Sequence, residues 1–215
     1  AIKFTILTTK KVIIEEISKV CGSIGLSVAA HNSLCTGHFL SFGNKEQKKK
    51  YLPKLTTGEW KAAYCLTEPG SGSDANSGKT KAVLSADGQS YIINGQKMWI
   101  TNGGFADVYV VFAKIDNDEN LSAFIVERTF PGISLNPEEH KMGIKGSSTR
   151  QVFFTDCQVP VANLLSERGN GFKIAVNILN LGRIKLAGAA LGGSKRTSTL
   201  SVRYANERQQ FGRPI

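Results

Sequence analysis

The chain has 215 residues, of which 41% are hydrophobic, and a formal net charge of +10 at pH 7, which suits one or two globular domains with a substantial core. Its longest apolar runs, such as 24–30 and 108–113, fall far short of the roughly 18 residues that a membrane-spanning helix needs, so no transmembrane segment is predicted. Acidic residues Glu15 and Glu16 interrupt the apolar run after Lys11, which disfavours a signal peptide and indicates a protein that is not secreted.

The N-terminal third of the chain has a helical composition. Residues 10–43 predict one or two apolar helices. Asn44 is expected to cap a further short helix, with Gln47 at the third helical position completing a capping box, and Gly58 is expected to end it.

A possible metal cluster lies in the first predicted helices. His31, Cys35 and His38 are spaced by four and then three residues, so they could share a helix face and hold zinc. No fourth ligand or acidic partner is near them in the sequence, which favours an ordinary packed face. The four cysteines form no Cys-x-x-Cys pair, and each has apolar neighbours in the sequence. All four are therefore expected to be reduced and buried: Cys21, Cys35, Cys65 and Cys157.

The run Tyr-Cys-Leu-Thr-Glu-Pro-Gly-Ser-Gly-Ser-Asp over residues 64–74 is the most informative part of the chain. A buried strand over 62–66 is predicted to stop at Pro69. The hydroxyl groups of Thr67, Ser71 and Ser73, with backbone N–H groups near glycine, then suit a polar heteroaromatic cofactor. The alternative is a Gly/Ser surface turn, which uses the same residue types.

Part of this run matches the loose dinucleotide-binding fingerprint, as Gly70-x-Gly72-x-x-Ala75. That site requires a helix directly after the glycines, to receive the pyrophosphate at its N-terminus. Residues 79–84 instead predict another strand, so a nicotinamide site is disfavoured.

A second informative stretch covers residues 94–104. Asn94-Gly95 predicts a tight hairpin between strands at 91–93 and 98–100, which would bring Trp99 back toward the first loop. Thr101, two residues later, would project to the same face, so an indole and a hydroxyl could form a wall for a flat cofactor. The alternative is that Trp99 belongs to the β-domain core.

Further short strands are predicted at 80–84, 108–115, 123–126 and 151–154, separated by turn residues, as in an antiparallel barrel or sandwich. Helical composition returns from Gly171 to about Glu207, where small residues would allow close helix packing. The fold class predicted is α+β.

Several motifs together resemble the acyl-CoA dehydrogenase family. They occupy residues 65–77, 94–104, 143–149, 159–160, 171–173, 180–183 and 208–212, in the family's order and spacing, and the segment 178–183 is most similar to the very-long-chain branch. The resemblance implies three parts: residues 1–60 from an N-terminal helical domain, 61–165 as a middle β-domain that binds flavin and acyl-CoA, and 166–215 as the first helix of a C-terminal bundle.

The resemblance also implies site residues. FAD would be bound by Tyr64, Leu66, Thr67, Gly72, Ser73, Trp99, Ile100 and Thr101, and the FAD of a neighbouring subunit by Arg208 and Phe211. The acyl-CoA substrate would contact Ser73, Asn180, Leu181, Gly182 and Arg183.

The implied reaction is α,β-dehydrogenation of an acyl-CoA thioester in fatty-acid β-oxidation. A carboxylate removes the α-proton while the β-hydride goes to flavin N5, and an electron-transfer flavoprotein takes the electrons onward. The resemblance further implies a homodimer or homotetramer, in a bacterial cytoplasm or the mitochondrial matrix.

No residue of this chain matches the catalytic base. The family's usual Glu-Gly-Thr motif does not occur, and the alternative glutamate position, directly before Arg183, is Gly182. The base is therefore expected beyond Ile215, and the 215 residues are expected to be an inactive fragment of a longer chain.

Two other functions fit the same scaffold. An acyl-CoA oxidase would pass electrons from the flavin to oxygen, and a non-catalytic relative could bind nucleic acid. Residues 166–215 carry nine basic and two acidic side chains, but attraction of anionic CoA explains this excess. The lysines at 45–54 resemble a solvated helix face, and no nucleic-acid-binding motif accompanies them, so nucleic acid is not an expected partner.

Overall fold

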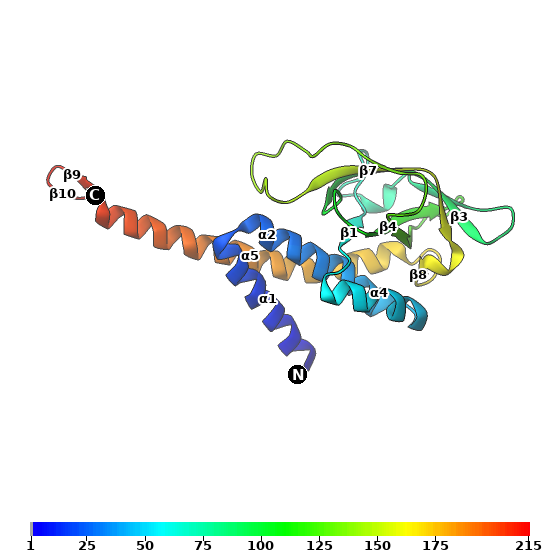
Figure 1. The fold of residues 1–215 in the computed structure, drawn as a ribbon, viewed down its shortest axis with the longest axis horizontal. Coiled ribbons are helices and arrows are strands. Elements are labelled where there is room, and N and C mark those ends of the chain that lie inside the picture. The colour runs from blue at the N-terminus through cyan, green and yellow to red at the C-terminus, as the bar shows by residue number, and fades with distance from the viewer. Residues whose placement is uncertain (1) are drawn as a thin grey trace.

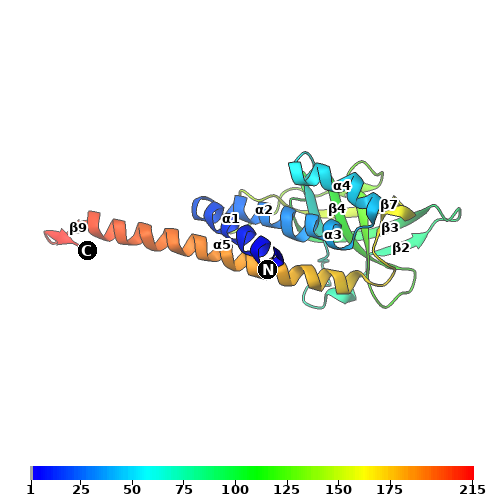
Figure 2. The same ribbon diagram turned by 90° about the horizontal axis from the view of Figure 1, so that it is seen from below.

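The computed structural model describes the backbone of residues 2–215 and the side chains of residues 11–215. Helices occupy the first quarter of the chain, a β-sheet follows, and one long helix, α5 (Gly171–Glu207), comes after the sheet, which confirms the α+β prediction. The sheet lies at one end of the molecule, and α5 runs beneath it and past α1 and α2 to carry the C-terminus far away (Figures 1 and 2).

The N-terminal region folds into more segments than predicted: α1 (Ile2–Val20), α2 (Gly22–Ala29), the π-helical segment η1 (Ala30–Cys35), α3 (Thr36–Phe42) and α4 (Lys45–Thr57). The break between α1 and α2 is at Cys21, whose backbone is extended. The capping box is confirmed, because Asn44 Oδ1 accepts from Gln47 N at 2.8 Å and Gln47 Oε1 accepts from Asn44 N at 3.1 Å. Gly58 ends α4 in the left-handed conformation, as predicted.

The sheet has eight strands: β1 (Ala62–Cys65), β2 (Lys81–Leu84), β3 (Ser90–Thr101), β4 (Val108–Ile115), β5 (Ser122–Glu127), β6 (Ile133–Leu135), β7 (Thr149–Pro160) and β8 (Leu164–Leu165). The strand order is β6-β7-β3-β2-β4-β5-β8, with β1 beside β4. Most pairs are antiparallel, as predicted, but β1 and β2 each run parallel to β4. The sheet is therefore mixed, and its path does not close into a barrel.

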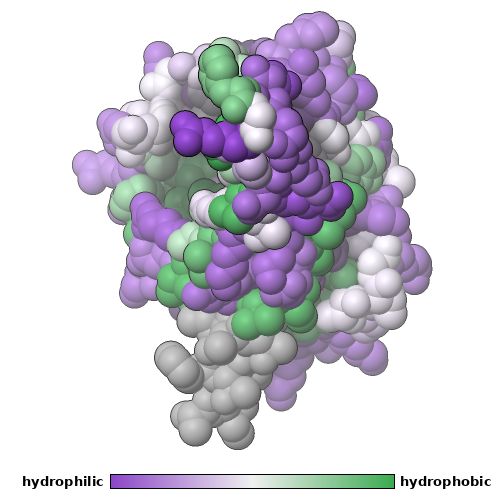
Figure 3. Space-filling model, turned by 90° about the vertical axis from the view of Figure 1, so that its left-hand side faces the viewer, coloured by the Kyte–Doolittle hydropathy of each residue, from purple (hydrophilic) through white to green (hydrophobic). Residues whose placement is uncertain are grey.

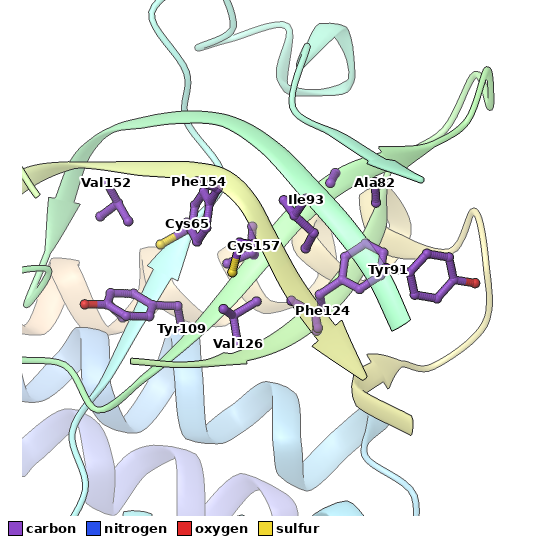
Figure 4. Packing of buried hydrophobic residues seen from close by; sticks show 14 of the residues in the cluster. Cys65, Ala82, Tyr91, Ile93, Tyr109, Phe124, Val126, Val152, Phe154 and Cys157 are labelled. Atoms are coloured by element: carbon purple, nitrogen blue, oxygen red, sulfur yellow. The ribbon is translucent and has the colours of Figure 1, made fainter. Parts of the chain in front are cut away.

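The core has two layers that share β4 and β5. Tyr109 and Val111 of β4 pack with β2, β3 and β7 in a cluster between the two halves of the sheet (Figure 4). Val110 and Phe112, on the opposite face of the same strand, pack with α3, α4 and the start of α5. Both faces of β4 are buried, which explains its nearly unbroken apolar sequence.

The predicted hairpin at Asn94-Gly95 is wrong. β3 runs without interruption through both residues and pairs with β7, with a register shift between Ile93 and Gly95. Asn94 bonds across this irregularity to β7, since its Nδ2 donates to Asp156 Oδ1 at 3.0 Å. A Cβ on Gly95 would lie 2.8 Å from Thr80 Cα, so the close approach of the backbone requires glycine here.

Helix α5 packs closely on α1 through buried Gly188 and Gly192, which confirms the expected use of small residues. Its distal part projects into solvent and leads to a short ribbon of β9 (Gln209–Gln210) and β10 (Arg213–Pro214). Figure 3 views this end of the molecule, where hydrophobic surface reaches solvent among hydrophilic side chains. By length and composition alone α5 could cross a membrane, but core helices of water-soluble proteins pass the same test.

Candidate functional site

A cavity of about 410 Å³, here called the main cavity, lies where the loop after β1 meets the end of β3 and the first half of α5. Its lining includes all eight residues of this chain that the sequence predicted for a flavin site: Tyr64, Leu66, Thr67, Gly72, Ser73, Trp99, Ile100 and Thr101. Ala30, Leu34, Ala75, Phe172, Val176, Leu179 and Arg183 complete it. The fold therefore brings together two segments that lie about 30 residues apart in sequence.

The polar groups of the main cavity are available to a ligand. The side-chain hydroxyls of Thr67, Ser73 and Thr101 make no hydrogen bond to any of the residues that the structure describes. The expectation for Ser71 is wrong, because its buried hydroxyl donates to the Asp74 carbonyl at 2.8 Å and does not line the cavity. Trp99 is 61% exposed although it is large and aromatic. Hydroxyl donors beside an indole face suit a planar group with ring nitrogens and carbonyls, so the lining fits a flavin.

Trp99 reaches the cavity through an irregularity in β3. Its backbone has a φ of 56°, and the pairing of β3 with β7 shifts register between Lys97 and Ile100. The amide of Met98 donates to the carbonyl of Thr67 at 2.8 Å, which fastens the strand to the loop. Trp99 was therefore correctly predicted to lie beside the loop but for the wrong reason, since a bulge and not a hairpin turns it there.

A buried ion pair connects β3 to the loop after β1, the two segments that line the main cavity. Lys97 Nζ donates to Glu68 Oε1 at 2.7 Å and to the carbonyl of Leu66 at 3.2 Å. Glu68 Oε2 accepts from Lys79 N at 2.6 Å, and Glu68 Oε1 accepts from Thr80 N at 3.1 Å. The two side chains are almost inaccessible, at 1% exposure for Lys97 and 6% for Glu68. The loop that carries Thr67 and Ser73 is thus held by a charged network.

The ion pair shows in the pKa values of both groups. Burial alone would raise the pKa of Glu68, but the ammonium of Lys97 and the two backbone donors outweigh it and lower that pKa. Burial lowers the pKa of Lys97, and Glu68 offsets part of this effect. No sequence pattern indicates that Lys97 supports the site, because a lysine on an alternating strand normally points to solvent.

A second cavity of about 220 Å³, here called the apolar cavity, adjoins the main cavity. The two cavities share Ala30, Leu34, Thr101, Leu179 and Arg183, and the apolar cavity adds Leu26, Ala29, Ser33, Gly182, Lys185 and Leu186. A Cβ on Gly182 would lie 3.0 Å from Leu34 Cδ2, so a larger residue there would press on Leu34 and narrow the space. The geometry gives a polar chamber that continues into an apolar one.

Sequence comparisons agree with this arrangement. Three domain models of one family match the chain in order: acyl-CoA dehydrogenase N-terminal domain at residues 6–59, middle domain at 63–157 and C-terminal domain at 169–215. The chain belongs to the acyl-CoA dehydrogenase family.

Among relatives, a probable acyl-CoA dehydrogenase of Bacillus subtilis is 57% identical over 194 residues, which cover 90% of this chain and 32% of that protein. The human mitochondrial very long-chain specific acyl-CoA dehydrogenase is 48% identical over 200 residues, covering 89% of this chain and 30% of the human protein. The chain thus spans about a third of the length of these relatives.

Solved structures show the same likeness. An acyl-CoA dehydrogenase complexed with FAD from Bacillus anthracis superposes with a TM-score of 0.92 at 54% identity, covering 94% of this chain and 35% of that one. A structure described as the electron transferring flavoprotein of Acidaminococcus fermentans gives 0.90 at 45% identity, covering 94% and 53%.

Only some of the remaining predicted site residues of this family member lie at the two cavities. Arg183 lines both cavities and Gly182 the apolar one, but Asn180 and Leu181 line neither. Asn180 Oδ1 instead accepts a hydrogen bond from Arg183. Arg208 and Phe211 follow α5 in the segment with β9 and β10, at the end of the molecule far from the sheet (Figure 1). Phe211 is fully exposed, and neither residue lines the main or the apolar cavity. Their role toward a neighbouring subunit stays a prediction.

The candidate metal ligands are structural residues. His31 uses both ring nitrogens, since Nε2 bonds to the Leu55 carbonyl at 2.9 Å and Nδ1 accepts from Ala62 N at 3.2 Å. Cys35 is fully buried, and the Nδ1 of His38 bonds to the Leu34 carbonyl. Within the described part of the chain, no three His, Cys, Asp or Glu residues are grouped to hold a metal. The four cysteines are free thiols, though Cys21 is only partly buried.

His38 gives the fold a predictable sensitivity to acid. Burial lowers its pKa from 6.5 to about 4, partly offset by its bond to Leu34. Between these two pKa values the imidazole is protonated in the unfolded chain but neutral in the folded chain. The free energy of unfolding therefore decreases as the pH falls from 6.5 through 4, by up to about 3 kcal/mol. His38→Phe, which retains a ring against Phe112, should flatten this slope in unfolding experiments across that pH range. Equal slopes for both proteins would contradict the assignment.

Proposed function

We propose that the protein containing these residues is an FAD-dependent acyl-CoA dehydrogenase. The observation that carries this proposal is the gathering of eight predicted flavin-site residues on one cavity that opens into an apolar cavity. The proposal is supported by the similar structure from Bacillus anthracis, which is an acyl-CoA dehydrogenase complexed with FAD.

In this proposal the main cavity would hold the isoalloxazine ring. Thr67 and Thr101 would donate hydrogen bonds to its polar atoms, and the indole of Trp99 would pack against the ring. When bound, FAD supplies the hydride acceptor that no protein side chain can provide. The contribution of this chain is to orient the ring, exclude water from it and hold it next to the apolar cavity.

The apolar cavity suits the acyl part of a thioester substrate, because six of its eleven lining residues are leucine or alanine. Arg183, at the boundary between the cavities, carries a positive charge that attracts the anionic CoA moiety. The proposed substrates are therefore long, unsubstituted acyl-CoA thioesters. This agrees with the very-long-chain specificity named for the human relative.

Among the residues that the structure describes, no aspartate or glutamate lines either cavity, so the proposal places the catalytic base outside these 215 residues. A glycine at position 182 cannot accept the proton. We further propose that an electron-transfer flavoprotein accepts the electrons, and that the protein works as a homo-oligomer in a bacterial cytoplasm or the mitochondrial matrix, in line with the sources of its relatives.

The cofactor part of the proposal is tested on the full-length protein with Thr67→Val, which replaces the hydroxyl in the main cavity by a methyl group. Loss of one hydrogen bond to FAD should raise its Kd about tenfold. The matched control is Thr57→Val, because Thr57 is exposed and bonds only within α4 and to the next turn. An equal loss of FAD affinity in both variants, or no binding of FAD by the unmodified protein, would contradict the assignment of Thr67 to the flavin site.

The reaction is tested by adding long-chain acyl-CoA to the FAD-loaded, full-length protein under anaerobic conditions. Bleaching of the flavin band at about 450 nm, with electrons passed on to an electron-transfer flavoprotein, is expected. Stoichiometric hydrogen peroxide in air would identify an oxidase instead. Absence of bleaching would indicate a non-catalytic relative.

A further inference from the structure

Three cavities follow one another along α5. The main cavity touches the helix from Phe172 to Arg183, and the apolar cavity touches it from Leu179 to Leu186. A third cavity of about 200 Å³, here called the inner cavity, is lined by Ile13, Ile14, Val28, Asn32, Ser33 and Lys185. Of the described residues, only Ser33 and Lys185 line both the apolar and the inner cavity, so these two side chains form the wall between them.

Both side chains of the wall are buried, which is unusual for a lysine. Lys185 is 4% exposed on a helix that leaves many apolar side chains in solvent, and its Nζ donates a hydrogen bond to Ser33 Oγ. Ser33, in the π-helical segment η1, is equally buried. A buried polar side chain that gives up a hydrogen bond to an alkyl chain gains nothing in return, so this wall is not displaced by the substrate.

We infer that the Ser33–Lys185 wall sets the longest acyl chain that the apolar cavity accepts. The inference rests on the proposed function, because it requires the apolar cavity to hold the acyl group. A chain that enters from the main cavity passes Leu34 and Gly182 and then meets the wall. The apolar side chains of Ile13, Ile14 and Val28 lie beyond it, so removal of the wall would extend the path for further methylene groups.

The test uses the FAD-loaded, full-length protein and a series of straight-chain S-alkyl-CoA thioethers of increasing length. These compounds lack the thioester carbonyl and cannot be dehydrogenated, so the Kd reports binding without turnover. Each added methylene should tighten binding about fourfold until the chain reaches the wall, after which the gain should stop.

Two substitutions of Lys185 distinguish the effect of its side-chain volume on the chain-length limit from the effect of its polar end. Lys185→Ala removes the side chain and joins the two cavities, so the gain in affinity should continue beyond the wild-type limit, by about fifteenfold for chains two methylenes longer. Lys185→Met retains most of the volume without the charge, so it should keep the wild-type limit. Thermal unfolding confirms that each variant is folded, and Lys185→Val serves as the second opening variant if Lys185→Ala is not.

The outcomes are distinct. The inference is supported if the chain length at which affinity stops rising increases in Lys185→Ala or Lys185→Val but not in Lys185→Met. An unchanged limit in the opening variants, an equal shift in Lys185→Met, or failure of both opening variants to fold overturns it while the proposed function stands. Failure of the unmodified protein to bind any of the thioethers overturns the proposed function, and the inference with it.

Discussion

Lys97→Met is expected to lower the free energy of unfolding by about 3–5 kcal/mol, because it leaves the buried carboxylate of Glu68 without its partner. The carboxylate would retain its two backbone donors but would lie in a site too dry for an isolated charge. Chemical denaturation of the full-length protein measures the loss. The same variant should weaken FAD binding, since Lys97 also bonds to the carbonyl of Leu66 at the edge of the main cavity.

The double variant Glu68→Gln/Lys97→Met separates the lost charge pair from the unpaired charge. Replacement of both partners by neutral groups of similar shape leaves no buried charge, so most of the stability should return. The matched control is Lys19→Met, because Lys19 pairs with Glu16 at 2.6 Å on an exposed helix face, where an ion pair contributes about 0–1 kcal/mol. A loss in Lys97→Met no larger than in this control would contradict the role of the buried pair.

Gly192→Ala is expected to destabilise the contact between α1 and α5. A Cβ at this position would lie 2.2 Å from the carbonyl oxygen of Glu15, which is backbone and cannot turn aside. The two helices would have to separate, at a cost of about 1–3 kcal/mol even though alanine is the better helix former. The ion pair between Lys195 and Glu15 at 2.6 Å should weaken as α1 and α5 move apart.

Gly193→Ala provides an internal control one residue away. A Cβ on Gly193 meets no atom of the described residues within 4 Å, so only helix propensity changes. This variant should gain about 0.5–1 kcal/mol in the free energy of unfolding. Opposite signs for adjacent glycines, measured by chemical denaturation, would establish that the close approach of α1 requires Gly192. Stabilisation by both substitutions would show that the helices accommodate the methyl group freely.

Most of the candidate site could be predicted from the sequence because its residues cluster in two short motifs. Thr67 and Ser73 follow a strand that ends at a proline and glycines, and Trp99 and Thr101 lie in the second motif. Their hydroxyl and indole groups indicated a planar ligand. Asn180 and Leu181 line neither cavity, because the helical rotation of α5 directs only Gly182 and Arg183 of that motif into them.

Local signals in the sequence determined the α4 cap at Asn44, the end of that helix at Gly58 and the existence of most strands, because each depends on residues only a few positions apart. The tertiary structure alone decided that Asn94-Gly95 forms a bulge, since its hydrogen-bond partner Asp156 lies 62 residues away. It also decided that Lys97 and Lys185 are buried. Their partners, Glu68 and Ser33, come from distant segments, and only the packed chain brings opposite charges or donors and acceptors together out of water.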